Sequence, residues 1–297
     1  MMAPLTEDVG LVRLAEALED NCAALFRQFA EMLGGDLVET PEGGRHLTFP
    51  DNGTFKGAWR SRLTAENADA AIDETIAWFK ARNAPYFHWW THAGTTPDDL
   101  GHRLVSRGFE SRYTDSGFDP DVPSVEQGSP VMVADMRQFD ESLLERMPSG
   151  FRVTPALTEA DLDAFCAVVD TVYPKMPDVS RAWTDATRRA GIGHAPWRLY
   201  VAWLDDEPVA TNIVTEGGGI VGLWVINTVP TQRRKGIGAA VTIAPLLEWR
   251  DKGYRYAGLF ASDEGALLYE RIGFAHTGTR INRLRWADDA EQHAAKH

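Results

Sequence analysis

A short basic turn with two glycines joins an apolar run to a helical segment in the second half of the sequence. Residues 220–229 form the apolar run, which predicts a strand buried on both faces. Residues 233–238, called the glycine loop below, follow it and open a helix that extends to about Arg250. This order of strand, turn and helix predicts a mixed α/β fold, because such a strand must be covered by other elements.

The glycine loop has the features of an anion-binding helix N-terminus. Backbone N–H groups in the first helical turn have no intrahelical partner and lie at the positive end of the helix dipole, so a pyrophosphate can dock on them. Gly236 and Gly238 let the backbone approach the phosphates without a Cβ in the way. The residues after Gly238 do not form a nucleotide P-loop, and Val241 replaces the third glycine of a dinucleotide fingerprint. An ordinary basic turn at the start of a surface helix remains the alternative.

The elements expected in the two halves of the chain follow the same order. The first half should contain a helix at 11–33, strands at 36–40 and 46–49, a helix from 64, a strand at 85–91, a helix at 96–107, and strands at 109–118 and 131–135. The second half should contain a strand at 151–154, helices from 158 and at 180–190, a hairpin of strands 198–204 and 208–215, the strand and helix around the glycine loop, a strand at 256–261, a helix at 265–271 and a strand at 277–286. Composition breaks at 119–124 and 147–150 favour two mixed α/β domains, residues 1–140 and 150–297.

A second motif lies downstream of the glycine loop. Leu268-Tyr269-Glu270-Arg271-Ile272-Gly273-Phe274 ends a predicted short helix. With the glycine loop, this segment resembles the GNAT superfamily of acyl-CoA-dependent N-acyltransferases, whose motifs are Arg/Gln-x-x-Gly-x-Gly/Ala after a core strand and Tyr-x-x-x-Gly-Phe further on. The resemblance covers about residues 151–286. It implies that each domain is a mixed, mostly antiparallel twisted sheet flanked by helices.

The resemblance also implies a set of site residues. Tyr269 stands where many relatives place the general acid that protonates the departing thiolate, and a phenol is a donor at neutral pH. Ser262 stands where many relatives carry an asparagine that contacts the cofactor. The residues expected to hold the pantetheine arm are Asn227, Thr228 and Val229, and those expected to cradle the pyrophosphate are Arg233, Arg234, Lys235, Gly236, Ile237, Gly238 and Ala239.

Two features depart from the family pattern. The strand before Pro230 carries no carboxylate, so the usual place for a general base is empty, and Glu216 is a weak candidate for that role. A partly neutral amine or a water relay would make a base unnecessary. Pro245 lies inside the helix after the glycine loop and is expected to kink it, at about 3 kcal/mol unless the distortion is accommodated.

The resemblance implies transfer of an acetyl group from acetyl-CoA, as co-substrate, to a primary amine of a small molecule or peptide. The motif region contains no cysteine, so the amine is expected to attack the thioester directly. Two alternatives stay open: an acyl-CoA-binding regulatory module without turnover, and an acyl-CoA enzyme of different chemistry on the same fold.

The first half retains the second motif in altered form. In Leu104-Val105-Ser106-Arg107-Gly108-Phe109 a leucine replaces the tyrosine, and no glycine loop precedes it. This half therefore resembles a degenerate repeat that binds no CoA and instead shapes the acceptor site or the domain interface. His88, Trp90 and His92 would share one face of a strand, where a packed core strand is favoured over a metal site or aromatic cage. No metal is expected.

Composition restricts the partners and the location. A net charge of −13 and a pI of about 5.1 argue against non-specific nucleic-acid binding. No apolar run approaches the roughly 18 residues of a membrane span, and the acidic N-terminus does not resemble a secretory signal. The two cysteines are expected to be separate thiols. The expectation is a soluble cytoplasmic protein with an amine partner, no nucleic-acid or membrane partner, and a homodimer left open.

Overall fold

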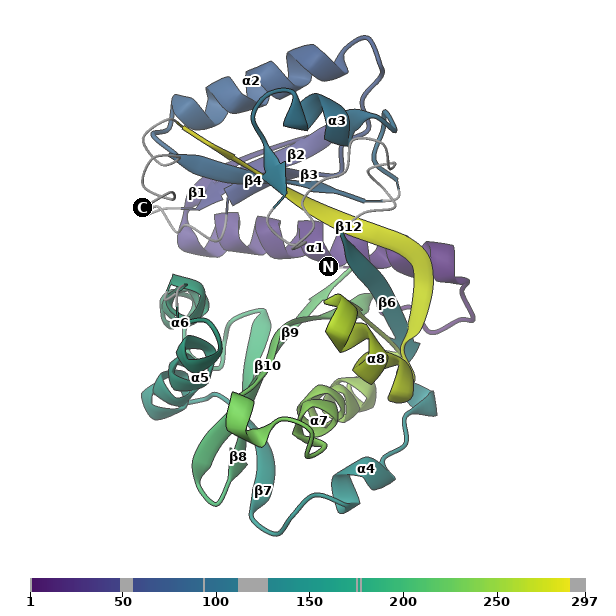
Figure 1. The fold of residues 1–297 in the computed structure, drawn as a ribbon, viewed down its shortest axis with the longest axis vertical. Helices are drawn as coiled ribbons and strands as arrows, with labels where there is room; N and C mark the ends of the chain where they lie inside the picture. Colours follow the sequence, from purple (N-terminus) through teal and green to yellow (C-terminus); the bar gives the residue numbers. More distant parts are fainter. Residues whose placement is uncertain are drawn as a thin grey trace. The chain divides into compact units, whose positions relative to one another are not determined.

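The computed structural model describes residues 2–48, 56–92, 94–111, 128–174, 176 and 178–288. The chain divides into two compact units (Figure 1). Residues 1–28 and 132–277 form the glycine-loop unit, and residues 29–131 and 278–297 form the companion unit. The sequence predicts contiguous domains, whereas these units interleave along the chain.

The glycine-loop unit is built on a mixed sheet with the strand order β6-β11-β10-β9-β8-β7. Pairing is antiparallel from β7 to β10 and parallel between β10 and β11. Helices α5 and α6 cover one face, and α7 and α8 cover the other (Figure 1). Its elements are β6 (Ser129–Asp135), η2 (Met136–Gln138), α4 (Ser142–Glu145), β7 (Phe151–Pro155), α5 (Glu159–Val172), α6 (Asp178–Ala190), β8 (Trp197–Leu204), β9 (Glu207–Gly217), β10 (Ile220–Thr228), η3 (Pro230–Gln232), α7 (Ile237–Asp251), β11 (Tyr256–Phe260) and α8 (Asp263–Arg271), with the first part of α1 (Leu11–Leu33).

The companion unit repeats this plan with fewer elements. Its strands follow the order β1-β2-β3-β4-β12, and β5 also pairs with β12. Pairing is antiparallel except between β3 and β4, which are parallel. The elements are β1 (Gly35–Thr40), β2 (Gly43–Thr48), β3 (Lys56–Trp59), α2 (Ala68–Lys80), β4 (Tyr86–Thr91), α3 (Leu100–Val105), β5 (Glu110–Ser111) and β12 (Ala275–Ala287).

Each unit contains a parallel pair of strands joined through a helix. Helix α7 connects β10 to β11, and α2 connects β3 to β4. The predicted mixed α/β fold class, with mostly antiparallel strands flanked by helices, is confirmed. Strand β3 was missed by the sequence analysis, because its four residues, Lys-Gly-Ala-Trp, have no alternating pattern.

Helix α3 begins later than the sequence predicts. The expected start at Thr96-Pro97 gives way to Leu100, with Asp99 at the N-cap. Thr96 is instead held in an extended pairing: its N–H donates to Ser61 O at 3.1 Å and its hydroxyl to Leu63 O at 2.8 Å. The expected strand at 109–118 is observed at Glu110–Ser111 and does not include buried Phe109. Residues 112–118 of that strand, the break at 119–124 and the C-terminal tail from 289 lie outside the described residues.

The first residues of the chain are tied to the sheet of the glycine-loop unit. Fully buried Asn21 of α1 donates from Nδ2 to the carbonyls of Thr215 and Ile220 at 3.2 and 3.3 Å, and its Oδ1 accepts from the Thr215 hydroxyl at 2.8 Å. Before the helix, Leu5 N–H donates to Gly219 O at 2.8 Å. A single buried amide therefore satisfies several backbone groups at the β9–β10 turn, which fixes α1 on this sheet.

Helix α7 continues through Pro245 because a neighbouring side chain replaces the missing backbone donor. A proline at 245 cannot donate to the carbonyl of Val241, one turn earlier. The Nδ2 of Asn212 on β9, a fully buried residue, donates to that carbonyl at 3.0 Å. The free-energy cost that the sequence analysis expected for Pro245 is thus offset by this hydrogen bond from the sheet.

We expect Asn212→Ala to lower the free energy of unfolding by about 1–3 kcal/mol, because the buried Val241 carbonyl would lose its donor. Pro245→Ala restores a backbone N–H at that position. The penalty of Asn212→Ala should therefore be smaller in the Pro245→Ala background, as measured by urea unfolding of the four proteins of this double-mutant cycle. An equal penalty in both backgrounds would show that Asn212 does not replace the proline's donor.

Helix α7 buries residues around most of its circumference, as expected for the central helix of the unit, and its larger buried side chains include Ile237, Leu246 and Trp249. Across the described ranges, no helix combines the length and apolar character needed to cross a bilayer.

Candidate active site

Strand β10 contains a β-bulge just before the glycine loop. Its pairing with β9 is regular as far as Trp224 opposite Ile213 and resumes at Asn227 opposite Thr211, so β10 has one extra residue. Val225 within this bulge has φ of 50°, a rare conformation for a β-branched residue. The hydroxyl of Thr211 donates to the Val225 carbonyl at 3.0 Å and holds the bulge in place.

Strand β10 extends beyond its pairing with β11. The parallel register covers Val221 to Leu223 of β10 and ends there, although β10 continues to Thr228. The next side chain of each strand, Trp224 and Phe260, meet edge to face with their ring centroids 5.6 Å apart. The bulge therefore lies where the two parallel strands separate. Beyond it, the backbone of β10 is not paired with β11.

The glycine loop continues directly from this strand. Gly236 is the N-cap of α7 in the left-handed conformation, with φ of 82°, and no side chain caps the helix. Because the N-cap residue has no side chain, it does not cap the backbone N–H groups at the start of α7, as a pyrophosphate cradle requires. A Cβ on Gly238 would lie 3.1 Å from Leu268 Cδ2 and 3.6 Å from Thr228 Oγ1, so Gly238 also allows α7, β10 and α8 to approach closely.

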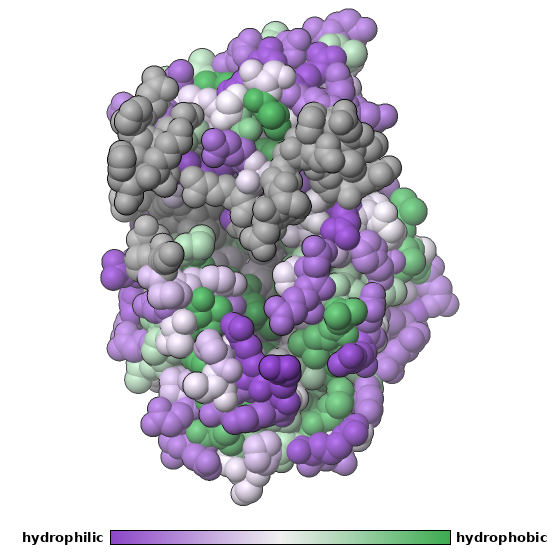
Figure 2. Space-filling view, in the orientation of Figure 1, coloured by the Kyte–Doolittle hydropathy of each residue, from purple (hydrophilic) through white to green (hydrophobic). Residues whose placement is uncertain are grey.

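The three cations of the loop are exposed, and two of them are anchored. Arg233 donates from Nε to the carbonyl of Thr228 at 3.2 Å, and Lys235 donates from Nζ to Gln232 Oε1 at 2.8 Å. Figure 2 shows a strongly hydrophilic area over the segment between η3 and α7, next to a hydrophobic area over α8. Leu267 of α8 is 60% exposed, so the polar loop borders apolar surface.

Asn227 lies between the bulge and the loop with an unsatisfied donor. The residue is 5% exposed, and its Nδ2 is buried with no hydrogen-bond partner in the described part of the chain. An unpaired buried amide costs about 1–3 kcal/mol. A donor left over at this position fits the predicted contact between Asn227 and the pantetheine arm, which carries amide carbonyls.

Helix α8 places Tyr269 in the interior. Ser262 is the N-cap of α8, and its hydroxyl oxygen accepts from Gly265 N–H at 3.0 Å, so the serine has a structural role in the helix. Tyr269 is 8% exposed and packs edge to face against Phe274 at a centroid distance of 5.8 Å. Burial raises the pKa of the Tyr269 phenol, and the neighbouring Tyr173 raises that pKa further.

Tyr173, at the C-terminal end of α5, is a further candidate for the site that the sequence analysis did not identify. Burial raises the pKa of its phenol, and the positive charge of Arg233 opposes this rise. Electrostatic effects link Arg233 to Tyr173 and Tyr173 to Tyr269, so the two residues of each pair lie within the range of a direct Coulomb interaction. No sequence motif contains Tyr173. It follows the last residue of α5, and only the tertiary fold brings this end of the helix close to α8 and the glycine loop.

Glu216 is not brought to this end of the sheet. It pairs with Val221 and accepts a hydrogen bond from the Tyr254 hydroxyl at 2.7 Å. The bulge of β10 lies opposite Asn212, four residues before Glu216 on β9. At about 3.3 Å per residue this separation is roughly 13 Å along the strand, so the Glu216 carboxylate is too far from the bulge for a direct contact.

The aromatic strand of the companion unit is largely buried. His88 and His92 are 8% and 5% exposed, as the packed-strand interpretation predicts. Among the residues that the structure describes, no three His, Cys, Asp or Glu side chains cluster so as to hold a metal ion.

Comparison with known proteins identifies relatives of the whole chain. The family description "Acetyltransferase (GNAT) domain" matches residues 132–271. A mycothiol acetyltransferase from Nocardiopsis dassonvillei is 25% identical over 296 residues, covering 95% of this chain and 84% of the relative.

Solved structures show the same fold. A GCN5-related N-acetyltransferase from Kribbella flavida matches with a TM-score of 0.66 and 16% identity, covering 90% of this chain and 95% of that protein. A tandem GNAT protein from the clavulanic acid biosynthesis pathway matches with a TM-score of 0.55 and 12% identity, covering 96% of this chain and 97% of that protein. The match to the GNAT acetyltransferase family thus covers residues 132–271, and the solved structures extend the shared fold over most of the chain.

Proposed function

We propose that the glycine-loop unit transfers the acetyl group of acetyl-CoA to a primary amine of a small molecule or peptide. The observation that carries this proposal is the continuity of three elements: the bulged end of β10, its separation from β11 and the uncapped, glycine-opened start of α7. GNAT proteins generally use acetyl-CoA, and the name of the relative from Nocardiopsis dassonvillei supports acetyl transfer.

The residues of the site fit an extended acyl-CoA. The N–H groups at the start of α7 and the cations of the glycine loop would hold the pyrophosphate. The unsatisfied Nδ2 of Asn227 and the free edge of β10 would hold the pantetheine arm, which leads to the bulge at Val225. Backbone donors at the bulge would polarise the acetyl carbonyl, as in an oxyanion hole.

Acetyl-CoA supplies an acetyl group activated as a thioester, which the amine nitrogen attacks directly. The C–N bond forms, the C–S bond breaks, and Tyr269 donates its proton to the departing sulfur. Burial disfavours the phenolate, so this proton must move together with C–S cleavage rather than before it. The amine arrives neutral, and the proton that its nitrogen loses once the C–N bond has formed passes through water to the Tyr269 phenolate or to bulk solvent, so the step needs no protein base.

The two alternatives, a binding module without turnover and an acyl-CoA enzyme of different chemistry, are separable in one experiment. Thiol release from acetyl-CoA is followed with a panel of primary amines and without acceptor, and the products are examined by mass spectrometry. We expect thiol release that depends on the amine, with one acetyl group added to the acceptor. Release without any acceptor would indicate other chemistry, and no release with any amine would indicate a binding module.

We expect one acetyl-CoA per chain in a calorimetric titration of the full protein. The companion unit has Asn67 at the N-cap of α2 and no glycine loop before it, and fully buried Leu104 stands at the tyrosine position. Saturating acetyl-CoA should also raise the melting temperature by mass action. A stoichiometry of two would show that the companion unit has kept a cofactor site.

A further inference from the structure

An aromatic pair bridges the two strands of the candidate site at the point where they separate. The last paired residues are Leu223 of β10 and Leu259 of β11. Their side chains belong to the core that packs against α7, so the next residues, Trp224 and Phe260, point to the opposite face of the sheet. The two rings meet there edge to face, with their centroids 5.6 Å apart and their planes at 71°. The pair therefore spans the opening between the strands on the face that α5 covers.

Buried hydrogen bonds fix the indole of Trp224. Its Nε1 donates to the hydroxyl oxygen of Thr215 on β9 at 2.9 Å. That hydroxyl donates its own proton to Asn21 Oδ1 of α1 at 2.8 Å. Thr215 and Asn21 are both fully buried, so water does not compete for this bond between them. The indole is therefore held by a hydrogen bond and by its contact with Phe260, and a change of rotamer would lose both.

The pantetheine arm of the proposed acyl-CoA would end at this pair. An arm that leaves the start of α7 passes Asn227, whose Nδ2 has no partner in the described part of the chain, and follows β10 back toward Val225. The unpaired edge of β10 closes at Leu223, where β11 takes up the pairing. Paired strands lie about 4.8 Å apart, so no channel continues between them. The acyl group would therefore lie in the wedge between the bulge and the two rings.

We propose that Trp224 and Phe260 restrict the acyl group to acetyl, and that Thr215 is a positioning residue for the indole. This inference rests on the proposed acetyl-CoA site and adds a determinant of acyl selectivity to it. Both rings are half-buried, so each presents some surface beside the bulge. A longer acyl chain would have to displace one ring from the contacts that hold it, and forcing extra methylenes into a packed site is unfavourable.

The test measures the binding of CoA, acetyl-CoA and hexanoyl-CoA to the full-length protein by calorimetry, without an acceptor amine. All three carry the same nucleotide and pantetheine, so differences in affinity report the acyl end alone. The selectivity ratio is defined as the affinity for acetyl-CoA divided by that for hexanoyl-CoA. We expect a ratio of at least about 10 for the parental protein, as is typical of overpacking.

Substitutions of the two rings should lower this ratio. In Trp224→Ala the hexanoyl chain would fill the vacated space, so the selectivity ratio should fall to about 1 or below. Phe260→Ala enlarges the same wedge from β11 and should also lower the ratio. The test therefore does not depend on the folding of a single variant.

Trp203→Ala is the matched control for Trp224→Ala. Trp203 of β8 is also half-buried, and its Nε1 also donates to a threonine hydroxyl, Thr154 Oγ1, at 2.9 Å. Strand β8 pairs with β7 and β9 rather than with β10 or β11. Loss of this indole should lower stability but keep the parental selectivity ratio. An equal fall of the ratio in both variants would overturn the proposal.

Two substitutions of Thr215 separate its positioning role from a purely structural one. Valine has nearly the shape of threonine but no oxygen to accept from the indole, whereas serine keeps the hydroxyl. Thr215→Val should lower the selectivity ratio several-fold, and Thr215→Ser should keep the parental ratio. A loss of stability alone would change the affinities for all three ligands together and leave the ratio unchanged. A parental ratio in Thr215→Val would therefore refute the positioning role.

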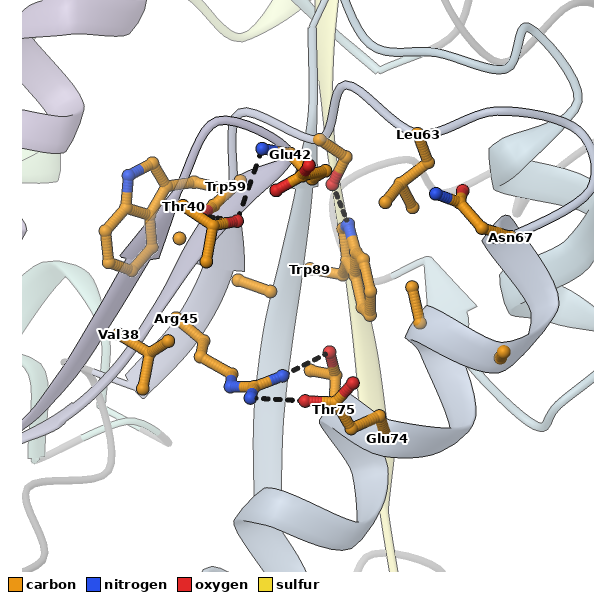
Figure 3. Close-up of a pocket in the computed structure, with 16 residues that line it drawn as sticks. Val38, Thr40, Glu42, Arg45, Trp59, Leu63, Asn67, Glu74, Thr75 and Trp89 are labelled. Carbon is orange, nitrogen blue, oxygen red and sulfur yellow. Dashed lines mark hydrogen bonds and ion pairs between the residues drawn. The ribbon is translucent and has the colours of Figure 1, made fainter.

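A cavity in the companion unit provides the control for adventitious binding of the hexanoyl chain. It has a volume of about 360 Å³ and lies between the sheet and α2, with Leu63 and Ala71 in its lining (Figure 3). Arg45, which also lines it, donates from Nη2 to Glu74 Oε1 at 2.7 Å. Ala71→Phe fills this cavity and should leave all three affinities unchanged. Loss of hexanoyl-CoA binding when Ala71→Phe is added to Trp224→Ala would place the chain in the cavity and overturn the proposal.

Failure of this inference is distinguishable from failure of the proposed function. A parental selectivity ratio of about 1, or an unchanged ratio in both Trp224→Ala and Phe260→Ala, would overturn the inference and leave the acetyl-CoA site in place. No binding of CoA or acetyl-CoA to the parental protein would overturn both.

Discussion

Gly236→Val is expected to abolish acetyl-CoA binding, with a loss of affinity of about 100-fold or more. Gly236 adopts φ of 82° at the N-cap of α7, and a β-branched residue cannot hold that conformation without strain. The loop would rearrange and misalign the N–H groups at the start of the helix. Losing two charge-assisted bonds of about 1.5–3 kcal/mol each accounts for the expected factor. Calorimetry and the thermal shift with acetyl-CoA provide the measurement.

Gly253→Val is the matched control for this variant. Gly253 has φ of 95° just beyond the other end of α7, and a Cβ there would meet nothing within 4 Å. It should therefore suffer similar backbone strain and lose stability without losing acetyl-CoA affinity. A full thermal shift with acetyl-CoA in Gly236→Val, or equal losses of affinity in both variants, would contradict the assignment of the glycine loop as the pyrophosphate site.

Tyr269→Phe is expected to lower turnover by about 100-fold or more while leaving acetyl-CoA affinity unchanged. The substitution keeps the packing against Phe274 and removes only the hydroxyl. The pKa of Tyr269 is raised above its ordinary value of 10.0, so the phenol keeps its proton to higher pH than a free tyrosine. The Tyr269-dependent part of kcat should therefore not decline below about pH 10. Steady-state kinetics over a pH series measure both effects.

Tyr173→Phe is the comparison that assigns the proton to one phenol. Tyr173 lies near Tyr269 and Arg233, is 38% exposed, and also has a raised pKa. If Tyr269 is the acid, Tyr173→Phe should retain most of the turnover. Parental turnover in Tyr269→Phe together with a large loss of turnover in Tyr173→Phe would identify Tyr173 as the general acid. Parental turnover in both would leave water as the proton donor.

The structure also explains how helix α7 accommodates Pro245, which the sequence analysis expected to kink it. From the sequence, Pro245 is expected to disrupt α7, because helix propensity takes no account of contacts with other elements. The donor that accommodates it, Asn212, lies 33 positions earlier on β9 and reaches Val241 only after the helix docks on the sheet. Glu216 illustrates the reverse: it was a weak candidate because the strand before Pro230 carries no carboxylate, and its antiparallel pairing with Val221 places it at the end of β10 farthest from the loop.

The sequence by itself determined the elements whose information is local: the helices, the hairpins, the buried strand β10 and the glycine loop with its following helix. Hydrophobic periodicity, caps and glycines act over a few residues, so they can be recognised without a fold. Only the tertiary structure decided the interleaving of the two units, the bulge at Val225, the neighbourhood of Tyr173 and Tyr269, and the cavity beside Arg45. Each of these depends on contacts between segments far apart in the chain, whose free energy is set by packing and pairing rather than by local conformational preference.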